Sequence, residues 1–199
     1  TTRDITNLTA TPTAPEALTG TEFLYQEGQT VHTGYDLSWT HDRLNLSDFV
    51  LEYALNDDNF LTITTSNPST TIKALRAGTL TVRIAARSYL GQQSAFAEST
   101  FTLAGKTAVP GDVQNLSIEP ISANSARLRW DQTVDLDVKV NGLVQIKHSN
   151  LTDGTATWPN SVNLVPAVSG NSTEAIVPLV EGEIMVKFVD ELNNKSATE

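Results

Sequence analysis

The histidines of this chain are its clearest candidates for acid–base chemistry. His41 is followed by Asp42, which is half of the arrangement in which a carboxylate orients an imidazole base. The chain has no cysteine, and no serine lies in the G-x-S-x-G turn that presents a nucleophile. We therefore expect His41 and Asp42 to make loop hydrogen bonds. His148 lies in an expected strand without a second histidine or a cysteine nearby, so we expect it to lie on the surface or to pack across to a neighbouring strand.

Two groups of side chains carry the oxygen atoms that calcium prefers. One is the run Asn56–Asn59, and the other is the series Asp131, Asp135 and Asp137. Calcium takes about six to eight oxygen ligands, and neither group forms the Asp-x-Asp-x-Asp-Gly loop with a distal glutamate. We interpret the run as a turn and the series as a solvated strand edge or interdomain rim. The sequence thus predicts no metal-binding residue and no cofactor.

Glu181 and Glu183 are the nearest approach to a pair of catalytic carboxylates. Strand alternation would place both on one solvent-facing side of a strand, whereas glycoside hydrolysis needs a cleft with one carboxyl group desolvated. The chain also lacks G-x-G-x-x-G, a phosphate-binding P-loop and H-E-x-x-H. We predict no catalytic residue, and we expect that the chain is not an enzyme.

The overall charge limits the class of partner. The chain has 23 Asp and Glu against 13 Lys and Arg, a net charge of −10. A negative surface repels nucleic acid and anionic lipid headgroups, so we expect no nucleic-acid partner. No apolar run approaches the roughly 20 residues that span a bilayer, so we expect no membrane insertion.

The elements that must position these residues alternate between apolar and polar side chains. This period of two is typical of strands with one buried face, and no window of the chain has the period of an amphipathic helix. We therefore predict an all-β chain with about seven short strands in each half. The expected inward rows are Tyr35, Leu37 and Trp39; Phe49, Leu51 and Tyr53; Leu80, Val82, Ile84 and Ala86; and Ala126, Leu128 and Trp130.

A repeat shows that the chain contains two copies of one domain. Leu75–Arg83 and Leu179–Lys187 both fit L-x-x-G-x-(L/I)-x-V-(K/R). Upstream, Asn7–Pro12 matches Asn115–Pro120, and the Leu-x-Trp ending at Trp39 matches the one ending at Trp130. Repeats of solenoid proteins span only about 20–50 residues, so this longer period indicates tandem domains.

The predicted domains are residues 1–104 and 105–199. Their boundary lies in a stretch of small residues that ends in Pro110-Gly111. Compared with each other, the first copy has an inserted segment near 13–30 and the second has an extended segment near 141–170. Phe23, Tyr25 and Trp158 fall in these segments, where we expect long loops that cover the open end of each sandwich.

This combination of residues resembles the fibronectin type III family. Trp39 on the second strand and Tyr53 on the third match its pattern, as does the L-x-x-G motif that leads into an alternating strand. Leu80 and Ile184 stand where that family usually has tyrosine. The resemblance implies two consecutive antiparallel β-sandwiches of the immunoglobulin-like kind.

The second copy has a more specific likeness over residues 134–196. The order is G-x-V-x-I-K-H-S at 142–149, then Trp158, then L-x-x-G at 179–182, then K-x-x-D-x-x-x-N-x-S at 187–196. It resembles the host-specificity (J-type) proteins at the tail tip of phages with long, non-contractile tails. That likeness implies a non-catalytic virion protein that spaces and presents receptor-binding parts. Its expected partners are other tail-tip subunits, in a homotrimer, and a bacterial surface receptor.

Two alternatives of other classes remain. One is a tandem fibronectin module of a bacterial surface or secreted adhesion protein. The other is an accessory domain of a carbohydrate-active enzyme, which predicts exposed aromatic side chains in a planar row. The N-terminus has neither an initiator methionine nor a signal-peptide core, so we expect the chain to be part of a longer protein.

Overall fold

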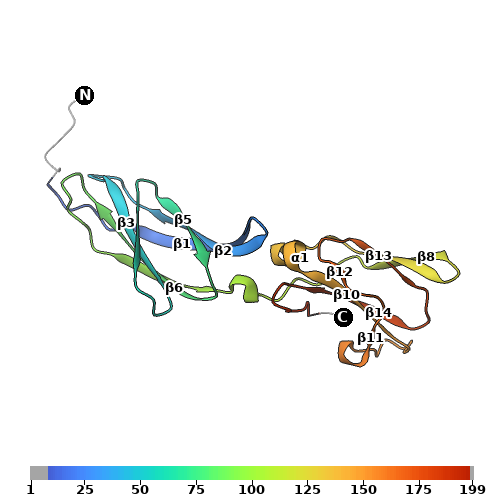
Figure 1. The fold of residues 1–199 in the computed structure, drawn as a ribbon. Helices are drawn as coiled ribbons and strands as arrows, with labels where there is room; N and C mark the ends of the chain where they lie inside the picture. Colours follow the sequence, from blue (N-terminus) through green and yellow to red (C-terminus); the bar gives the residue numbers. More distant parts are fainter. Residues whose placement is uncertain (1–8, 198–199) are drawn as a thin grey trace. The chain divides into compact units, whose positions relative to one another are not determined.

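The computed structural model describes residues 9–197, and strands dominate it (Figure 1). Residues 7–8 of the first repeat landmark lie outside the described residues. The described chain divides into two compact units: unit 1 contains residues 9–25 and 32–105, and unit 2 contains 26–31 and 106–197. None of the helices in 9–197 is long and apolar enough to cross a membrane. The predicted all-β class is confirmed.

Unit 1 is built from two facing antiparallel sheets. One has the order β1-β2-β5 and the other the order β4-β3-β6-β7. Their strands are β1 (Glu16–Glu27), β2 (Thr30–Thr40), β3 (Asp48–Leu55), β4 (Leu61–Thr65), β5 (Ser69–Leu75), β6 (Gly78–Arg87) and β7 (Ala97–Leu103). The core between the sheets contains the predicted rows from β2, β3 and β6, with Tyr53 partly buried. Trp39 packs edge-on against Phe49, with ring centroids 5.2 Å apart.

The segment near 13–30 is largely strand, so the prediction of a long loop there is wrong. Phe23 and Tyr25 lie in β1, which forms a sheet with β2. A β-carbon on Gly34 would clash with the Phe23 ring, and Tyr25 stacks on His32 with ring centroids 5.5 Å apart. Gly20 also lies in β1, and a β-carbon there would clash with the Tyr35 ring. These aromatic residues pack on the sheet and do not cover an open end.

Unit 2 repeats this arrangement with shorter strands. One sheet has the order β13-β9-β8; in the other, β10 pairs with β14 on one edge and with β11 and β12 on the other. The elements are β8 (Ser117–Ser122), β9 (Ser125–Arg129), α1 (Leu136–Asn141), β10 (Leu143–Ser149), β11 (Val162–Asn163), β12 (Val168–Ser169), β13 (Glu174–Pro178) and β14 (Glu183–Val189). Two short 3-10 helices span Gly105–Thr107 and Trp158–Asn160.

The core of unit 2 confirms the predicted row on β9. Ala126, Leu128 and Trp130 pack with Val144 and Ile146 of β10, Val186 and Phe188 of β14, and Val138 of α1. Helix α1 was not predicted, because six residues are too few to show a helical period. The extended segment near 141–170 holds β10 and the two short strands β11 and β12, and Trp158 lies in the loop between β10 and β11.

Candidate functional site

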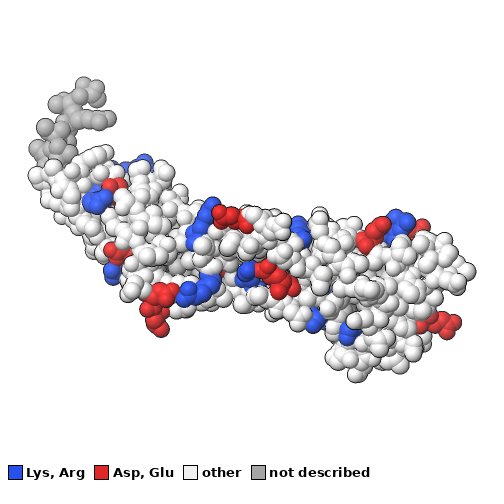
Figure 2. All heavy atoms as spheres, viewed as in Figure 1, with Lys and Arg blue, Asp and Glu red and all other residues white. Residues whose placement is uncertain are grey.

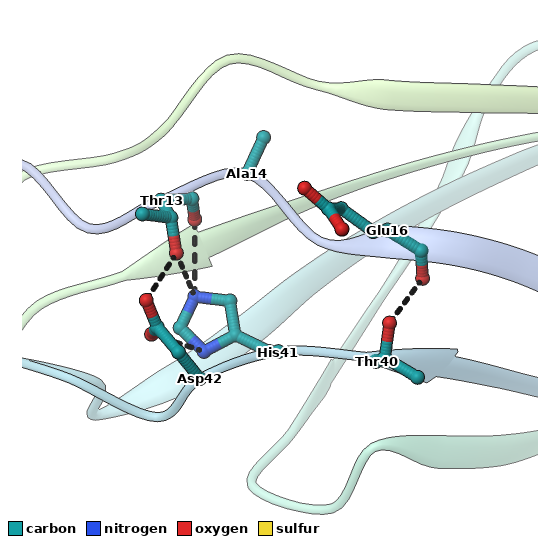
Figure 3. Close-up of a pocket in the computed structure, with 6 residues that line it drawn as sticks. All are labelled: Thr13, Ala14, Glu16, Thr40, His41 and Asp42. Carbon is teal, nitrogen blue, oxygen red and sulfur yellow. Dashed lines mark hydrogen bonds and ion pairs between the residues drawn. The ribbon is translucent and has the colours of Figure 1, made fainter.

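His41 and Asp42 lie where β2 ends, and with Thr13 they border a shallow hollow (Figure 3). The Nδ1 atom of His41 accepts the backbone N–H of Arg43 at 2.8 Å, so Nε2 carries the hydrogen and donates it to the Thr13 carbonyl oxygen at 3.0 Å. The His41 side chain is only 1% exposed, and its ring packs edge-on against Phe49. Both ring nitrogens are therefore occupied by the backbone.

Asp42 completes a loop cap. Its Oδ1 accepts the backbone N–H of Leu44 at 2.9 Å, and its Oδ2 accepts the Thr13 hydroxyl at 3.2 Å (Figure 3). A general base needs a free lone pair within reach of the proton that it removes, and His41 has none. The predicted loop hydrogen bonds of His41 and Asp42 are confirmed.

The three aspartates of the second copy make separate hydrogen bonds, two to backbone N–H groups and one to a side chain. Asp135 Oδ2 accepts the Gly111 N–H at 2.7 Å, and Asp131 Oδ2 accepts the Asn115 side-chain amide at 2.7 Å. Asp137 is buried, which contradicts its interpretation as part of a solvated edge. Burial raises the pKa of Asp137, and the negative charge of Asp190 raises it further. Within residues 9–197, no three His, Asp or Glu side chains are grouped to hold a metal ion.

Glu181 and Glu183 are not a pair on one strand. Glu181 lies in the bend before β14, and its carbonyl oxygen accepts a hydrogen bond from His148 Nε2 at 2.7 Å. The carboxylate of Glu183 accepts the backbone N–H groups of Gly154 and Ala156, at 2.7 and 3.2 Å. Glu183 thus fastens the loop after β10. His148 is buried and lies opposite Ile184 of β14, so of the two predicted roles the structure has the cross-strand one.

Trp158 covers the outer face of the β10–β14 sheet rather than an open end of the sandwich. Its side chain is 9% exposed, and the Nζ atoms of Lys147 and Lys187 lie 4.9 and 5.4 Å from the ring centroid. Lys147 Nζ also donates to the Trp158 carbonyl oxygen at 2.8 Å. Such cation–π contacts contribute about 0.5–2 kcal/mol each, so Trp158 holds its loop against the sheet.

The sequence did not identify a second aromatic cluster, which we call the Arg83 stack: Phe60, Arg83 and Phe96. The guanidinium of Arg83 lies 4.3 Å from the Phe60 ring centroid and 4.9 Å from that of Phe96. Glu52 accepts the Arg83 Nε–H at 2.6 Å. Both rings are more than a third exposed. Arginine and aromatic side chains are enriched at protein interfaces, and the alternation of β6 places Arg83 on its outward face.

Charges of both signs are interspersed on the face shown in Figure 2. Several of them form cross-strand ion pairs; Arg87, for example, donates to both carboxylate oxygens of Asp48 at 2.8 Å. Although acidic residues outnumber basic ones in the chain, this face therefore has no large area of a single charge sign. This face presents mixed charge, and the core of each unit is filled by apolar side chains.

The two units are two versions of one sandwich, as their strand orders show. In unit 1 the sheet β1-β2-β5 faces the sheet β4-β3-β6-β7, and in unit 2 the sheet β8-β9-β13 faces the sheet that contains β11, β10 and β14. Both units have a fibronectin type III-like fold. The structure is similar to a segment of two fibronectin type III domains from chicken tenascin, with 16% identity, a TM-score of 0.40, and coverage of 94% of this chain and 96% of that one. It is also similar to the FN1–FN3 domains of chicken CNTN1, with 11% identity and a TM-score of 0.35.

The chain spans 57% of the CNTN1 segment, and the matched part is 83% of this chain. Neither a scan against protein-family models nor a search of curated proteins finds a match. At these identities and TM-scores the two likenesses concern the fold alone, and the assignment of the sandwich depends on the strand order given above.

Proposed function

We propose that this chain is a non-catalytic structural and adhesive module. The observation that supports this most strongly is that the side chains considered as candidates for chemistry are already hydrogen-bonded within the fold. His41, His148, Asp135 and Glu183 each form hydrogen bonds to backbone groups of loops or bends. These residues hold loops on two filled sandwiches, which is the work of a scaffold that presents a surface.

The finer proposal is that the module belongs to the tail tip of a phage or prophage, in a host-attachment protein. It is supported by the sequence resemblance over residues 134–196. In such a protein the sandwiches space and present receptor-binding parts, together with other tail-tip subunits in a homotrimer. Threefold linkage of weak contacts with a bacterial surface receptor gains about 10²–10⁴ in apparent affinity without new contacts.

Immunogold labelling tests the location. Antibody raised against this chain is applied to purified virions of the phage or induced prophage whose genome encodes it, with virions from a deletion strain as control. We expect gold at the tail tip. Label confined to the capsid or tail tube, or an equal amount on the deletion control, would contradict the tail-tip assignment while leaving the fold unaffected.

A further inference from the structure

The outer face of the β1-β2-β5 sheet carries a shallow hollow of about 330 Å³. Strand alternation turns every second side chain of these strands away from the core of unit 1. The outward side chains around the hollow are short and polar: Thr19, Thr21, Asp36, Ser38, Ser69 and Thr71. Among the described residues that line the hollow, Asp36 carries the only charge. The hollow therefore offers hydroxyl groups and a single carboxylate.

The polar groups of the hollow are oriented by one another but keep capacity for a ligand. The Thr71 hydroxyl donates to Asp36 Oδ1 at 2.5 Å, and Thr19 Oγ1 and Ser38 Oγ lie 3.2 Å apart. The Oδ2 atom of Asp36 has no hydrogen-bond partner within residues 9–197, and this residue is exposed. A hydroxyl both donates and accepts, and a carboxylate accepts at both oxygens. These groups can therefore bind a molecule that is rich in hydroxyls.

An aromatic ring lies directly beside the hollow. Phe23 is the next outward residue of β1 after Thr21, and its ring occupies the space that a side chain at position 34 would need. Gly34 is in turn the outward residue next to Asp36 on β2. Phe23 is partly exposed and is not part of the core of unit 1. An apolar surface thus continues from the row that contains Thr21 and Asp36.

Tyr25 holds this aromatic surface in place. Its ring centroid lies 5.9 Å from that of Phe23 and 5.5 Å from that of His32, and Lys73 Nζ lies 5.1 Å from it. The Tyr25 hydroxyl accepts the Ala74 N–H at 3.1 Å, where β5 has one residue more than the facing part of β2. Ala74 has φ +58°, and such strained residues and bulges are concentrated at binding sites. The platform is therefore fixed before a ligand arrives.

We propose that this face is a saccharide-binding site, and that its ligand is a neutral pyranose ring of a bacterial surface glycan. A pyranose has an apolar face of C–H groups, which packs on the Phe23 ring. Its hydroxyl groups surround that face, and they bond to Asp36 Oδ2 and to the hydroxyls of Thr21 and Thr71. The proposal names the receptor chemistry of the adhesive module, and it rests on that part of the proposed function.

The lining favours a neutral sugar over two other kinds of ligand. The carboxylate of Asp36 repels an anionic sugar. A protein partner is disfavoured because protein interfaces have an apolar centre, whereas the centre of this hollow is formed by hydroxyl groups and a carboxylate. A few polar groups beside an aromatic surface are the usual composition of a small-molecule site.

Two-dimensional NMR of the 199-residue chain tests the site, with the methyl glycosides of glucose, galactose, mannose and N-acetylglucosamine as probes. We expect at least one probe to shift amide signals of residues 19–23, 34–38 and 69–73. Its dissociation constant should be roughly millimolar, as is usual for a ligand of one ring. Phe23→Leu keeps an apolar cover over Gly34 but removes the flat ring, and Asp36→Asn keeps an acceptor for Thr71 but removes the charge. Each should weaken binding by about fivefold or more.

Phe96→Leu and Asp57→Asn are the matched controls, because they remove an aromatic ring and a carboxylate of unit 1 that do not line the hollow. Both should bind the probe as the parent does. No shift in the three segments with any of the four probes would overturn the proposal, and so would equal binding by the parent and all four variants. Gold at the tail tip together with either result would remove the saccharide site and leave the tail-tip assignment intact.

Discussion

Gly182 and His148 pack directly against each other in unit 2. A β-carbon at Gly182 would lie 2.7 Å from His148 Nε2 and would clash with the Ser149 carbonyl oxygen. The φ angle of Gly182 is +123°, a value that side chains disfavour. The glycine of the repeated L-x-x-G motif is thus required by a contact. In unit 1, Gly78, at φ +148°, has the Asn56 side chain in the corresponding space.

Gly182→Ala is therefore expected to lower the free energy of unfolding of unit 2 by about 2–4 kcal/mol, because it adds both backbone strain and a clash. Gly154→Ala is the matched control, since Gly154 has φ +77° but nothing within 4 Å of a β-carbon. It should cost only about 1 kcal/mol. Denaturant unfolding followed by circular dichroism measures both, and equal losses would contradict the role given to His148.

Replacing the two tryptophans of the repeat, Trp39 and Trp130, with phenylalanine should lower stability by unequal amounts. Trp130 Nε1 donates to the Ser172 carbonyl oxygen at 2.8 Å, whereas buried Trp39 Nε1 has no hydrogen-bond partner among the described residues. Trp130→Phe leaves the Ser172 carbonyl unpaired, but Trp39→Phe removes an unsatisfied donor. We expect Trp130→Phe to lower the free energy of unfolding of unit 2 substantially. The loss should be about 1–3 kcal/mol greater than the loss that Trp39→Phe causes in unit 1. Equal losses in the same unfolding experiment would show that the indole bond contributes nothing.

Asp137 predicts a pH dependence of unit 2. Because its pKa is raised in the folded state, its contribution to stability is fully present below the unfolded pKa and is lost as the pH rises through the folded pKa. Asp137→Asn keeps an acceptor for the Val138 N–H and removes the buried charge. We expect a higher melting temperature than the parent near neutral pH, and no difference below about pH 3, where the aspartate is protonated in both states. A constant difference across this range would contradict the assignment.

For Asp153 we expect a pH dependence of stability with the opposite sign to that of Asp137. The Thr155 hydroxyl and backbone N–H donate to Asp153 Oδ1, at 2.5 and 3.2 Å, and lower its pKa. Its contribution is present above the unfolded pKa and is lost as the pH falls through the folded pKa. Asp153→Asn should therefore lower the melting temperature slightly near neutral pH and change nothing in acid. The effect is small because the carboxylate is fully exposed. Calorimetry of both aspartate variants at matched pH values distinguishes the two signs.

The sequence was most informative where one physical requirement acts along a whole strand. Alternation placed Tyr35, Leu37 and Trp39 in the core because a sheet with one buried face demands it over many residues. It failed at β1, where small and polar residues such as Gly20 interrupt the apolar signal and the neighbouring Tyr35 ring explains the glycine only in three dimensions.

The surroundings of the candidate site residues were harder to predict than the core rows, because they depend on contacts between residues that are distant in the sequence. The burial of Asp137 follows from the packing of α1, and this helix is too short to be predicted from a helical period in the sequence. The Arg83 stack joins residues of three separate chain segments, and Trp158 packs against lysines of two strands. Single-residue types cannot specify such groupings before the strand register is known.

The central claim is that the chain holds two sandwiches, each stabilised by its own core. Leu37 and Leu128 are equivalent core residues of the two units, 2% and 1% exposed. Each Leu→Ala substitution should cost about 2–5 kcal/mol. The most direct measurement is native-state hydrogen exchange of the intact chain carrying one substitution at a time. We predict that each variant loses protection only in strands of its own unit, whereas parallel loss in both units would show one shared cooperative core and contradict the account.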